Sequence, residues 1–311
     1  MTMQFTKAMR KKAKLRLALS GPSGSGKTWS ALLLAKGLGG KIAVIDTERG
    51  SASLYEQLAD FDALNLEAPY SPERYIEAIH AAEKSGYNVL VIDSITHEWS
   101  GVGGCLELVD EIARARYKGN SWSAWNDITP RHRALLDTIL HSPLHIIVTL
   151  RSKTETAQTE ENGRKKISKL GMKAEQRDGF EYEMTLVLDI VHDGHYATAT
   201  KDRTGLFVDH DPAPITEETG QRLLEWLETG ASAPDVQAIL NSLASAASMD
   251  VLKGHYEAAL QMLPEEHHVE IRKATNQRKQ ELLSFAAKVA AHQSREYMHD
   301  KDAEAMQGAE A

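Results

Sequence analysis

The chain has 311 residues, of which 42% are hydrophobic and 26% charged, so it can form a core domain of roughly 200–250 residues with a smaller appendage. A net charge of −8 excludes a protein coated in basic residues, although a local basic groove is still possible. The single cysteine, Cys105, excludes an intramolecular disulfide and fits a reducing cytoplasm. The sequence contains no apolar run of about 18 residues, so we expect no transmembrane helix.

The first predicted elements surround a glycine-rich loop. Residues 1–16 form a basic segment without any acidic residue. The apolar segment 15–19 follows and predicts a strand, and an apolar helix is expected directly after the loop. Residues 41–46 and 88–93 read as two buried strands.

Helix signals then alternate with further strands. Ser71 followed by Pro72 predicts a helix start, and that helix stops at Gly86. After a long helical stretch, Thr129 and Pro130 predict the start of another helix. The remaining predicted elements are a strand at 144–150, a β-hairpin formed by 182–190 and 195–201, and an amphipathic helix at 215–228.

This order predicts an α/β fold with a mostly parallel central sheet, an antiparallel hairpin at one side and a small C-terminal helical region. The expected domains are a basic N-terminal segment, an α/β core, a linker, a helical region and a disordered tail. Their expected bounds are 1–16, 17–228, 229–235, 236–294 and 295–311.

The loop carries the clearest chemistry, because it matches G-x-x-x-x-G-K-[ST] between a strand and a helix. Glycines let successive backbone N–H groups turn inward toward phosphate oxygens, and the helix directs its positive end to the same place. We expect the lysine to reach the β- and γ-phosphates of ATP and the threonine to bind Mg²⁺. The loop residues are Gly21, Pro22, Ser23, Gly24, Ser25, Gly26, Lys27 and Thr28.

Carboxylates follow two of the predicted strands. Asp93 ends the strand 88–93, at the position of a magnesium carboxylate, although it could also cap the next helix. Glu48 lies just past the strand 41–46, where a carboxylate can activate the water that attacks the γ-phosphate. Asp46 could be structural, and Glu98 is a rival base.

The sequences "GPSGSGKT", "IDTE" and "VLVIDSIT" together resemble the RecA-like core of recombinases. The resemblance implies that Glu48 is the water-activating base. The later stretch "ATATKDRTGLF" resembles the segment with which RadA and RecA proteins reach the γ-phosphate of a neighbouring subunit, which implies that role for Lys201 and Arg203. Phe5 and Ala8 resemble the recombinase tether between protomers, or form an ordinary amphipathic turn.

A closer resemblance covers about residues 12–228, through "IIVTLRSKTE", "KLGMKAEQRDGFEYEMT" and "TKDRTGLF". These stretches look like phage-encoded RecA-like ATPases of the AAA-family ATP-binding type, some of them grouped with single-strand-annealing recombinases. The resemblance implies a homo-oligomer, ring or filament, that hydrolyses ATP with Mg²⁺ while annealing or pairing single-stranded DNA in the host cytoplasm. The third strand departs from RecA, because it ends at Thr149–Arg151 instead of Asn-Gln, so either Thr149 or Arg151 could sense the γ-phosphate.

Two segments are candidates for single-stranded DNA. The first interleaves cations with aromatic rings, as sites for single strands do. The alternative is that its tryptophans pack a helix hairpin. Its residues are Arg114, Arg116, Lys118, Trp122 and Trp125. The second, residues 152–178, is expected to be a basic irregular insertion, or a solvated charge run. Its cations are Arg164, Lys165, Lys166, Lys169 and Lys173, with Arg177 at the end.

An alternative function remains open. The acidic balance also fits an ATP-dependent regulator or loader that acts through protein partners, and the C-terminal helices could dock a single-strand-binding protein or another recombination protein. His192 and His195 flank a tight turn, and two residues do not make a metal site.

Overall fold

The computed structural model describes residues 12–161, 164–208, 210–229, 235–263 and 265–307, and among them the side chains of 154–172, 266 and 289–307 are not described. Most of the basic segment, with Phe5 and Ala8, therefore lies outside the described residues. The chain divides into two compact units, Met1–Ala231 and Ser232–Ala311, each described by itself below.

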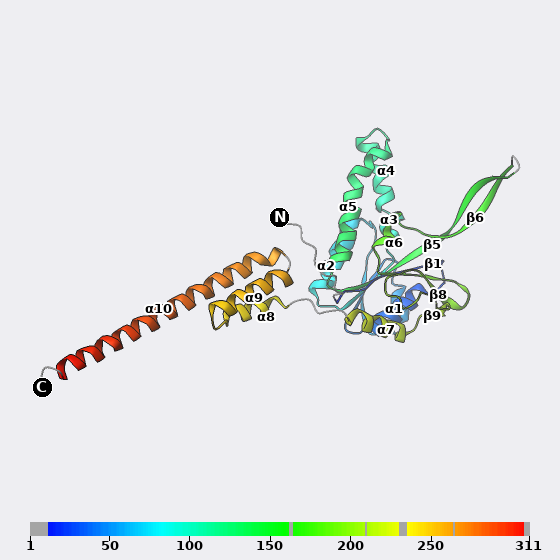
Figure 1. The fold of residues 1–311 in the computed structure, drawn as a ribbon. Helices are drawn as coiled ribbons and strands as arrows, with labels where there is room; N and C mark the ends of the chain where they lie inside the picture. Colours follow the sequence, from blue (N-terminus) through cyan, green and yellow to red (C-terminus); the bar gives the residue numbers. More distant parts are fainter. Residues whose placement is uncertain (1–11, 162–163, 209, 230–234, 264, 308–311) are drawn as a thin grey trace. The chain divides into compact units, whose positions relative to one another are not determined.

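A single twisted sheet forms the centre of the first unit (Figure 1). The strand order is β3-β2-β4-β5-β1-β7-β8-β9; the pairs from β3 to β7 are parallel, and β8 and β9 are antiparallel. This arrangement confirms the predicted α/β fold. The strands are β1 Arg16–Gly21, β2 Ile42–Asp46, β3 Phe61–Asn65, β4 Val89–Asp93, β5 His145–Glu161, β7 Leu186–Ile190, β8 Tyr196–Asp202 and β9 Ala213–Pro214.

Helices cover both faces of the sheet, so the inner strands are buried along their whole length and not only at alternate residues. On one face α1 (Lys27–Leu38) packs with α7 (Glu217–Glu228). The two helices can approach closely because Gly37 has no side chain. A Cβ at that position would collide with the backbone of α7. On the other face lie α2 (Pro72–Lys84) and part of α5 (Ser121–His141).

A helical arm leaves the core after β4. It consists of the short α3 (Thr96–Ser100), then α4 (Cys105–Arg116), which packs along α5 around a small apolar core. The prediction that a helix starts at Thr129 is wrong, because α5 begins at Ser121 and contains Pro130 in its interior. Asn120 sets the true start, since its side chain accepts a hydrogen bond from Ser123 N at 3.2 Å.

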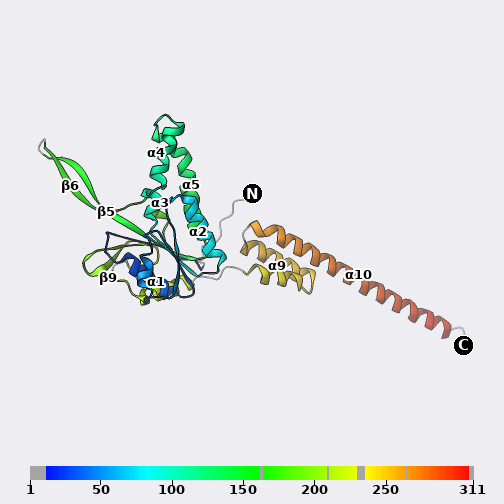
Figure 2. The same cartoon turned by 180° about the vertical axis from the view of Figure 1, so that it is seen from behind.

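A second arm is a two-stranded antiparallel ribbon, seen from both sides in Figures 1 and 2. It is formed by the outer part of β5 with β6 (Arg164–Ala174). The expectation of an irregular insertion at 152–178 is therefore wrong. The register places Glu160 opposite Lys165 and Glu161 opposite Arg164 along the backbone.

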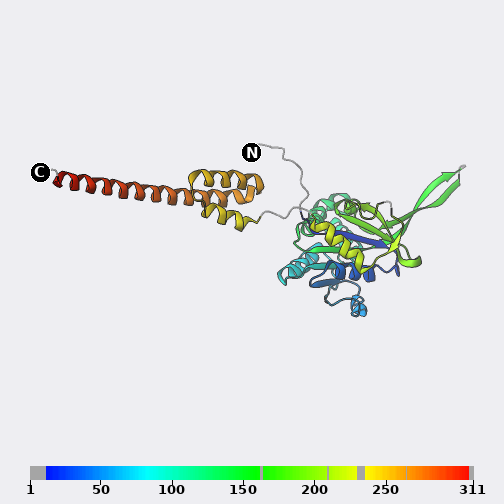
Figure 3. The same ribbon diagram turned by 60° about the horizontal axis from the view of Figure 1, so that its bottom comes forward.

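The second unit is helical, as the sequence predicts. Its helices α8 (Val236–Ala244), α9 (Met249–Met262) and the first part of α10 (His268–Gln307) lie side by side around their own apolar core (Figure 3). The sequence predicts a disordered tail at 295–311, but in the structure α10 continues to Gln307. Of the helices in the described ranges, none combines the length and the apolar character needed to cross a bilayer.

Candidate nucleotide-binding site

The glycine-rich loop joins β1 to α1 at the carboxyl edge of the parallel strands, where such sheets bind ligands. Gly24 and Gly26 have φ values of 76° and 89°, a region that favours glycine and turns the loop back on itself. Lys27 begins α1, and its Nζ donates a hydrogen bond to Pro22 O at 2.8 Å. Burial lowers the pKa of Lys27, while the carboxylates of Asp93 and Glu48 oppose that shift.

Asp93 lies below the loop at the end of β4, and two hydroxyls hold its carboxylate. Thr28 Oγ1 donates to one carboxylate oxygen at 2.6 Å, and Thr149 Oγ1 donates to the other at 2.5 Å. Burial raises the pKa of Asp93, and the two hydroxyls partly offset this rise. A buried carboxylate beside the first-turn threonine is the oxygen donor set that Mg²⁺ uses with a bound nucleotide, so Thr28 and Asp93 fit that ion.

Glu48 and Arg151 form an ion pair across the same pocket. Arg151 Nη2 and Nε donate to Glu48 Oε1 at 2.7 and 3.1 Å. The pocket has a volume of about 650 Å³, and Lys27, Thr28 and Asp93 also line it. Of the two candidates for sensing the γ-phosphate, Arg151 lines this pocket. Thr149 does not line it, and its hydroxyl donates to Asp93 instead.

The rival base does not line that pocket. Glu98 lies on α3, and its side chain is fully buried against α4 and α5. His97, which no sequence motif marks, lines the pocket in its place. Its Nδ1 lies 2.6 Å from Thr47 Oγ1 and its ring stacks on Tyr70, and burial lowers its pKa. A single histidine one residue before a glutamate gives no sequence signal for this placement.

The turn between β7 and β8 rests on the glycine-rich loop. His195 Nδ1 lies 2.9 Å from Ser25 O. A Cβ on Gly26 would come within 3.2 Å of the His195 ring, and one on Gly24 within 3.5 Å of His192 Nε2. The two histidines therefore support the phosphate loop from outside. No sequence pattern predicts this contact, because the partners are 170 residues apart.

Lys201 and Arg203 do not line the nucleotide pocket of their own chain. Both donate to backbone carbonyls of the short helix α6 (Phe180–Glu183). Lys201 Nζ donates to Glu181 O at 2.8 Å, and Arg203 Nη2 donates to Tyr182 O at 2.9 Å. Lys201 also lines a separate pocket of about 690 Å³ with Lys173 and Arg177. Burial and the neighbouring Arg203 lower the pKa of Lys201.

The two predicted DNA segments lie on the two arms. On the helical arm Trp122 is 85% exposed, whereas Trp125 stacks on Trp99 with ring centroids 5.5 Å apart. Arg177, at the base of the ribbon, lies 5.4 Å over the Trp125 ring, so the arms meet there. Arg114, Arg116 and Lys118 lie toward the tip of the helical arm.

The ribbon carries the other predicted cations. Lys173 forms an ion pair with Asp178 at 2.9 Å. The backbones of Arg164, Lys165, Lys166 and Lys169 lie on β6, and their side chains are outside the described residues.

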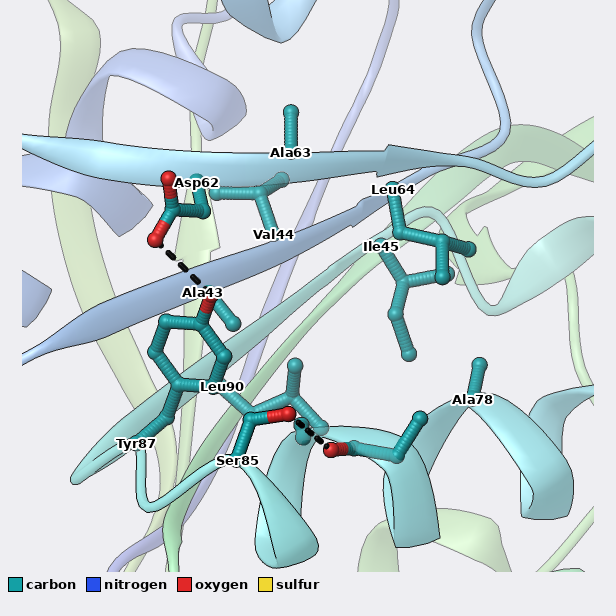
Figure 4. Close-up of a pocket in the computed structure, with 12 residues that line it drawn as sticks. Ala43, Val44, Ile45, Asp62, Ala63, Leu64, Ala78, Ser85, Tyr87 and Leu90 are labelled. Atoms are coloured by element: carbon teal, nitrogen blue, oxygen red, sulfur yellow. Dashed lines mark hydrogen bonds between the residues drawn. The ribbon is translucent and has the colours of Figure 1, made fainter.

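An apolar cavity of about 170 Å³ lies between the edge of the sheet and α2 (Figure 4). Its walls include Ala43, Ile45, Leu64 and Leu90, and its rim carries the hydrogen bond from Tyr87 OH to Asp62 Oδ2 at 2.7 Å. None of the phosphate-loop residues lines it, and its walls offer no cation for a phosphate.

Comparisons with known proteins identify the family of the chain. No curated protein matches it. Among solved structures, the chain is similar to a RadB recombinase, with 22% identity, a TM-score of 0.38, and coverage of 67% of this chain and 90% of that chain. A family model described as an AAA domain matches residues 13–227, which include the phosphate loop, Glu48 and Asp93. Because that match spans more than half of the sequence, the chain belongs to the AAA-domain family.

Proposed function

We propose that the chain binds ATP with Mg²⁺ at the phosphate loop and hydrolyses it, as a RecA-like ATPase that acts on single-stranded DNA in phage-type recombination. The observation that carries this proposal is the hydroxyl–carboxylate–hydroxyl arrangement of Thr28, Asp93 and Thr149 beneath the loop, with Glu48 across the pocket. This arrangement supplies each of the chemical groups that nucleotide hydrolysis needs on one side of the site.

Each residue has a proposed role. Lys27 exchanges its bond to Pro22 O for the β- and γ-phosphates, since charged oxygens attract an ammonium group more strongly than a carbonyl does. Mg²⁺ would supply charge neutralisation at the phosphates, held by Thr28 and Asp93. Glu48 orients and deprotonates the attacking water, and Arg151 positions Glu48 while it faces the γ-phosphate.

A second copy of the chain completes the site in this proposal. Lys201 and Arg203 bind only neutral carbonyl oxygens through the contacts described above, so both can turn to a phosphate on a neighbouring protomer. An arginine supplied in this way stabilises the transition-state charge and raises the rate by about 10³-fold or more. The proposed working form is therefore a homo-oligomer, a ring or a filament.

Single-stranded DNA is the proposed nucleic acid, bound by the two arms. The exposed Trp122 offers a ring face for a base, and the cations of the helical arm and of β6 offer charges for phosphates. The arms meet at Arg177 and Trp125, which would let one strand contact both. The proposed activity is annealing or pairing of strands in the cytoplasm.

The test is an ATPase assay with a titration of single-stranded DNA at several salt concentrations. We expect ATP turnover that DNA stimulates, DNA affinity that falls steeply with salt, and loss of turnover and ATP binding in Lys27→Ala. A matched control is Lys36→Ala, which removes a lysine from the opposite end of the same helix. ATP binding without any DNA affinity at low salt would contradict the DNA part of the proposal.

A second candidate function is an ATP-dependent regulator or loader that acts through a protein partner. Large apolar side chains on α10 favour it, because Val269, Leu283 and Phe285 are 78%, 54% and 68% exposed. Such a partner could be a single-strand-binding protein or another recombination protein. This function predicts ATP turnover that responds to the partner and not to DNA.

A further inference from the structure

Three side chains of different chemistry meet at one buried point between α3, α4 and α5. Glu98, Cys105 and His132 are 0%, 0% and 2% exposed. Glu98 Oε1 lies 3.0 Å from Cys105 Sγ and 3.0 Å from His132 Nδ1. The three ligand atoms all lie within 4.8 Å of one another. Such a cluster has the composition and the size of a metal site.

The charge of Glu98 has no strong counterpart in the described part of the chain. Its second oxygen, Oε2, accepts a hydrogen bond from Gln176 Nε2 at 3.3 Å, and no lysine or arginine there forms an ion pair with it. The carboxylate is thus surrounded by a thiol, an imidazole and an amide. A buried carboxylate is costly unless a cation or several strong hydrogen bonds accompany it, and a thiol is a weak donor.

The histidine ring can present a lone pair to a cation that takes the place of its Nδ1 proton. His132 Nε2 is buried and makes no hydrogen bond within the described residues. Without a cation, Glu98 Oε1 accepts the proton of Nδ1; a cation bound between them would replace that proton, and the tautomer with the proton on Nε2 would then present the Nδ1 lone pair to it. The only other partner of the ring given by the structure is Trp99, whose ring lies edge-on at 5.7 Å.

We propose that Glu98, Cys105 and His132 bind a zinc ion. A thiolate, an imidazole and a carboxylate are the donors that zinc prefers, whereas Mg²⁺ takes oxygen donors alone. Tetrahedral zinc with ligand bonds of about 2.0–2.3 Å places its donor atoms roughly 3.5 Å apart, so the two contacts of Glu98 Oε1 need to lengthen by only about half an ångström. A water molecule takes the fourth position.

The zinc ion is distinct from the nucleotide metal and has a structural role. Its three ligands join α3, which follows Asp93 directly, to both helices of the arm. Gln176 at the base of the ribbon contacts Glu98 and also Ile95 O, at 3.4 Å. The ion would therefore hold the roots of both arms next to the nucleotide site.

The experiment measures zinc in the purified full-length chain and then exchanges it for Co²⁺. We expect about one zinc per chain, and a thiolate-to-cobalt absorption band after exchange. Because Cys105 is the only cysteine, such a band identifies it as a ligand, and Cys105→Ser must abolish it. No bound zinc together with no band would overturn the proposal and leave a hydrogen-bonded polar cluster.

Control variants separate this site from others. His132→Ala is expected to weaken zinc binding at least tenfold, whereas His141→Ala, an exposed histidine at the end of the same helix, leaves it unchanged. Asp93→Asn removes the nucleotide carboxylate and must retain the cobalt band. If the buried variants fail to fold, release of zinc from the wild-type chain by a thiol-specific mercurial reports the same ligand. An unchanged zinc content after complete modification of Cys105 would contradict the proposal.

Discussion

At the scale of single residues, the proposed mechanism gives Arg151 a role that a single substitution can test. It holds Glu48 by two hydrogen bonds and lines the same pocket as Lys27. We expect Arg151→Ala to lower kcat by about 10²-fold, because a preorganised donor to the developing charge is removed, while ATP affinity changes little. Steady-state kinetics and nucleotide titration measure the two effects. Arg74→Ala, which removes a partly buried arginine bonded to the backbone carbonyls of Glu67 and Pro69, is the matched control. An unchanged kcat in Arg151→Ala would contradict this role.

A second residue gives a prediction for pH. Burial, and the charges of Lys14 and Arg16, lower the pKa of His145 to about 4, and its Nδ1 accepts a hydrogen bond from Leu15 N. The unfolded chain binds a proton near pH 6.5 and the folded chain only near pH 4, so stability falls as the pH falls between these values. From pH 7 to pH 5 this histidine should cost roughly 2 kcal/mol of the free energy of unfolding.

The measurement is denaturant unfolding followed by tryptophan fluorescence, since all five tryptophans lie in the first unit. His145→Asn, whose amide oxygen can replace Nδ1, should remove most of the pH dependence. The exposed His141→Asn should keep it. Equal pH dependence in the His145→Asn variant and the wild type would exclude His145 as its source.

At the scale of elements, the ribbon formed by β5 and β6 tests the DNA proposal. A triple variant, Lys165→Ala with Lys166→Ala and Lys169→Ala, should weaken single-strand binding and reduce the slope of log affinity against log salt, by about 0.7 for each phosphate that is no longer neutralised. Three exposed lysines of the second unit, Lys253, Lys273 and Lys279, give a control variant of equal charge change. Fluorescence anisotropy with labelled single strands reads both effects. An unchanged slope in the ribbon variant would exclude β6 from the DNA-binding surface.

The elements also show what a sequence can and cannot predict. The phosphate loop and the buried strands were predictable, because the loop motif has fixed spacing and parallel strands buried on both faces are mostly apolar. The ribbon was not, because its sequence is polar and charged without an apolar alternation, and its strands form by pairing with each other. Pro130 falsely suggested a helix start, since tertiary packing of α5 against α4 outweighs the missing hydrogen bond. The contact of His195 with Ser25 depends on the folded chain alone.

At the scale of the whole molecule, the proposed mechanism requires two chains for each active site. Glu48 acts within one chain, and Lys201 and Arg203 act from the next, so Glu48→Gln and Lys201→Ala should each abolish turnover by itself. Mixing the two inactive variants should restore activity, because an interface that pairs an intact Glu48 with an intact Lys201 is complete. Random mixing of equal amounts in a head-to-tail assembly makes about a quarter of the interfaces complete. The recovered rate, measured against a fixed concentration of wild type, should approach that fraction and vanish on dilution below the assembly concentration. A mixture that stays inactive while both variants still assemble and bind ATP would place both groups in one chain, and the shared site would have to be abandoned.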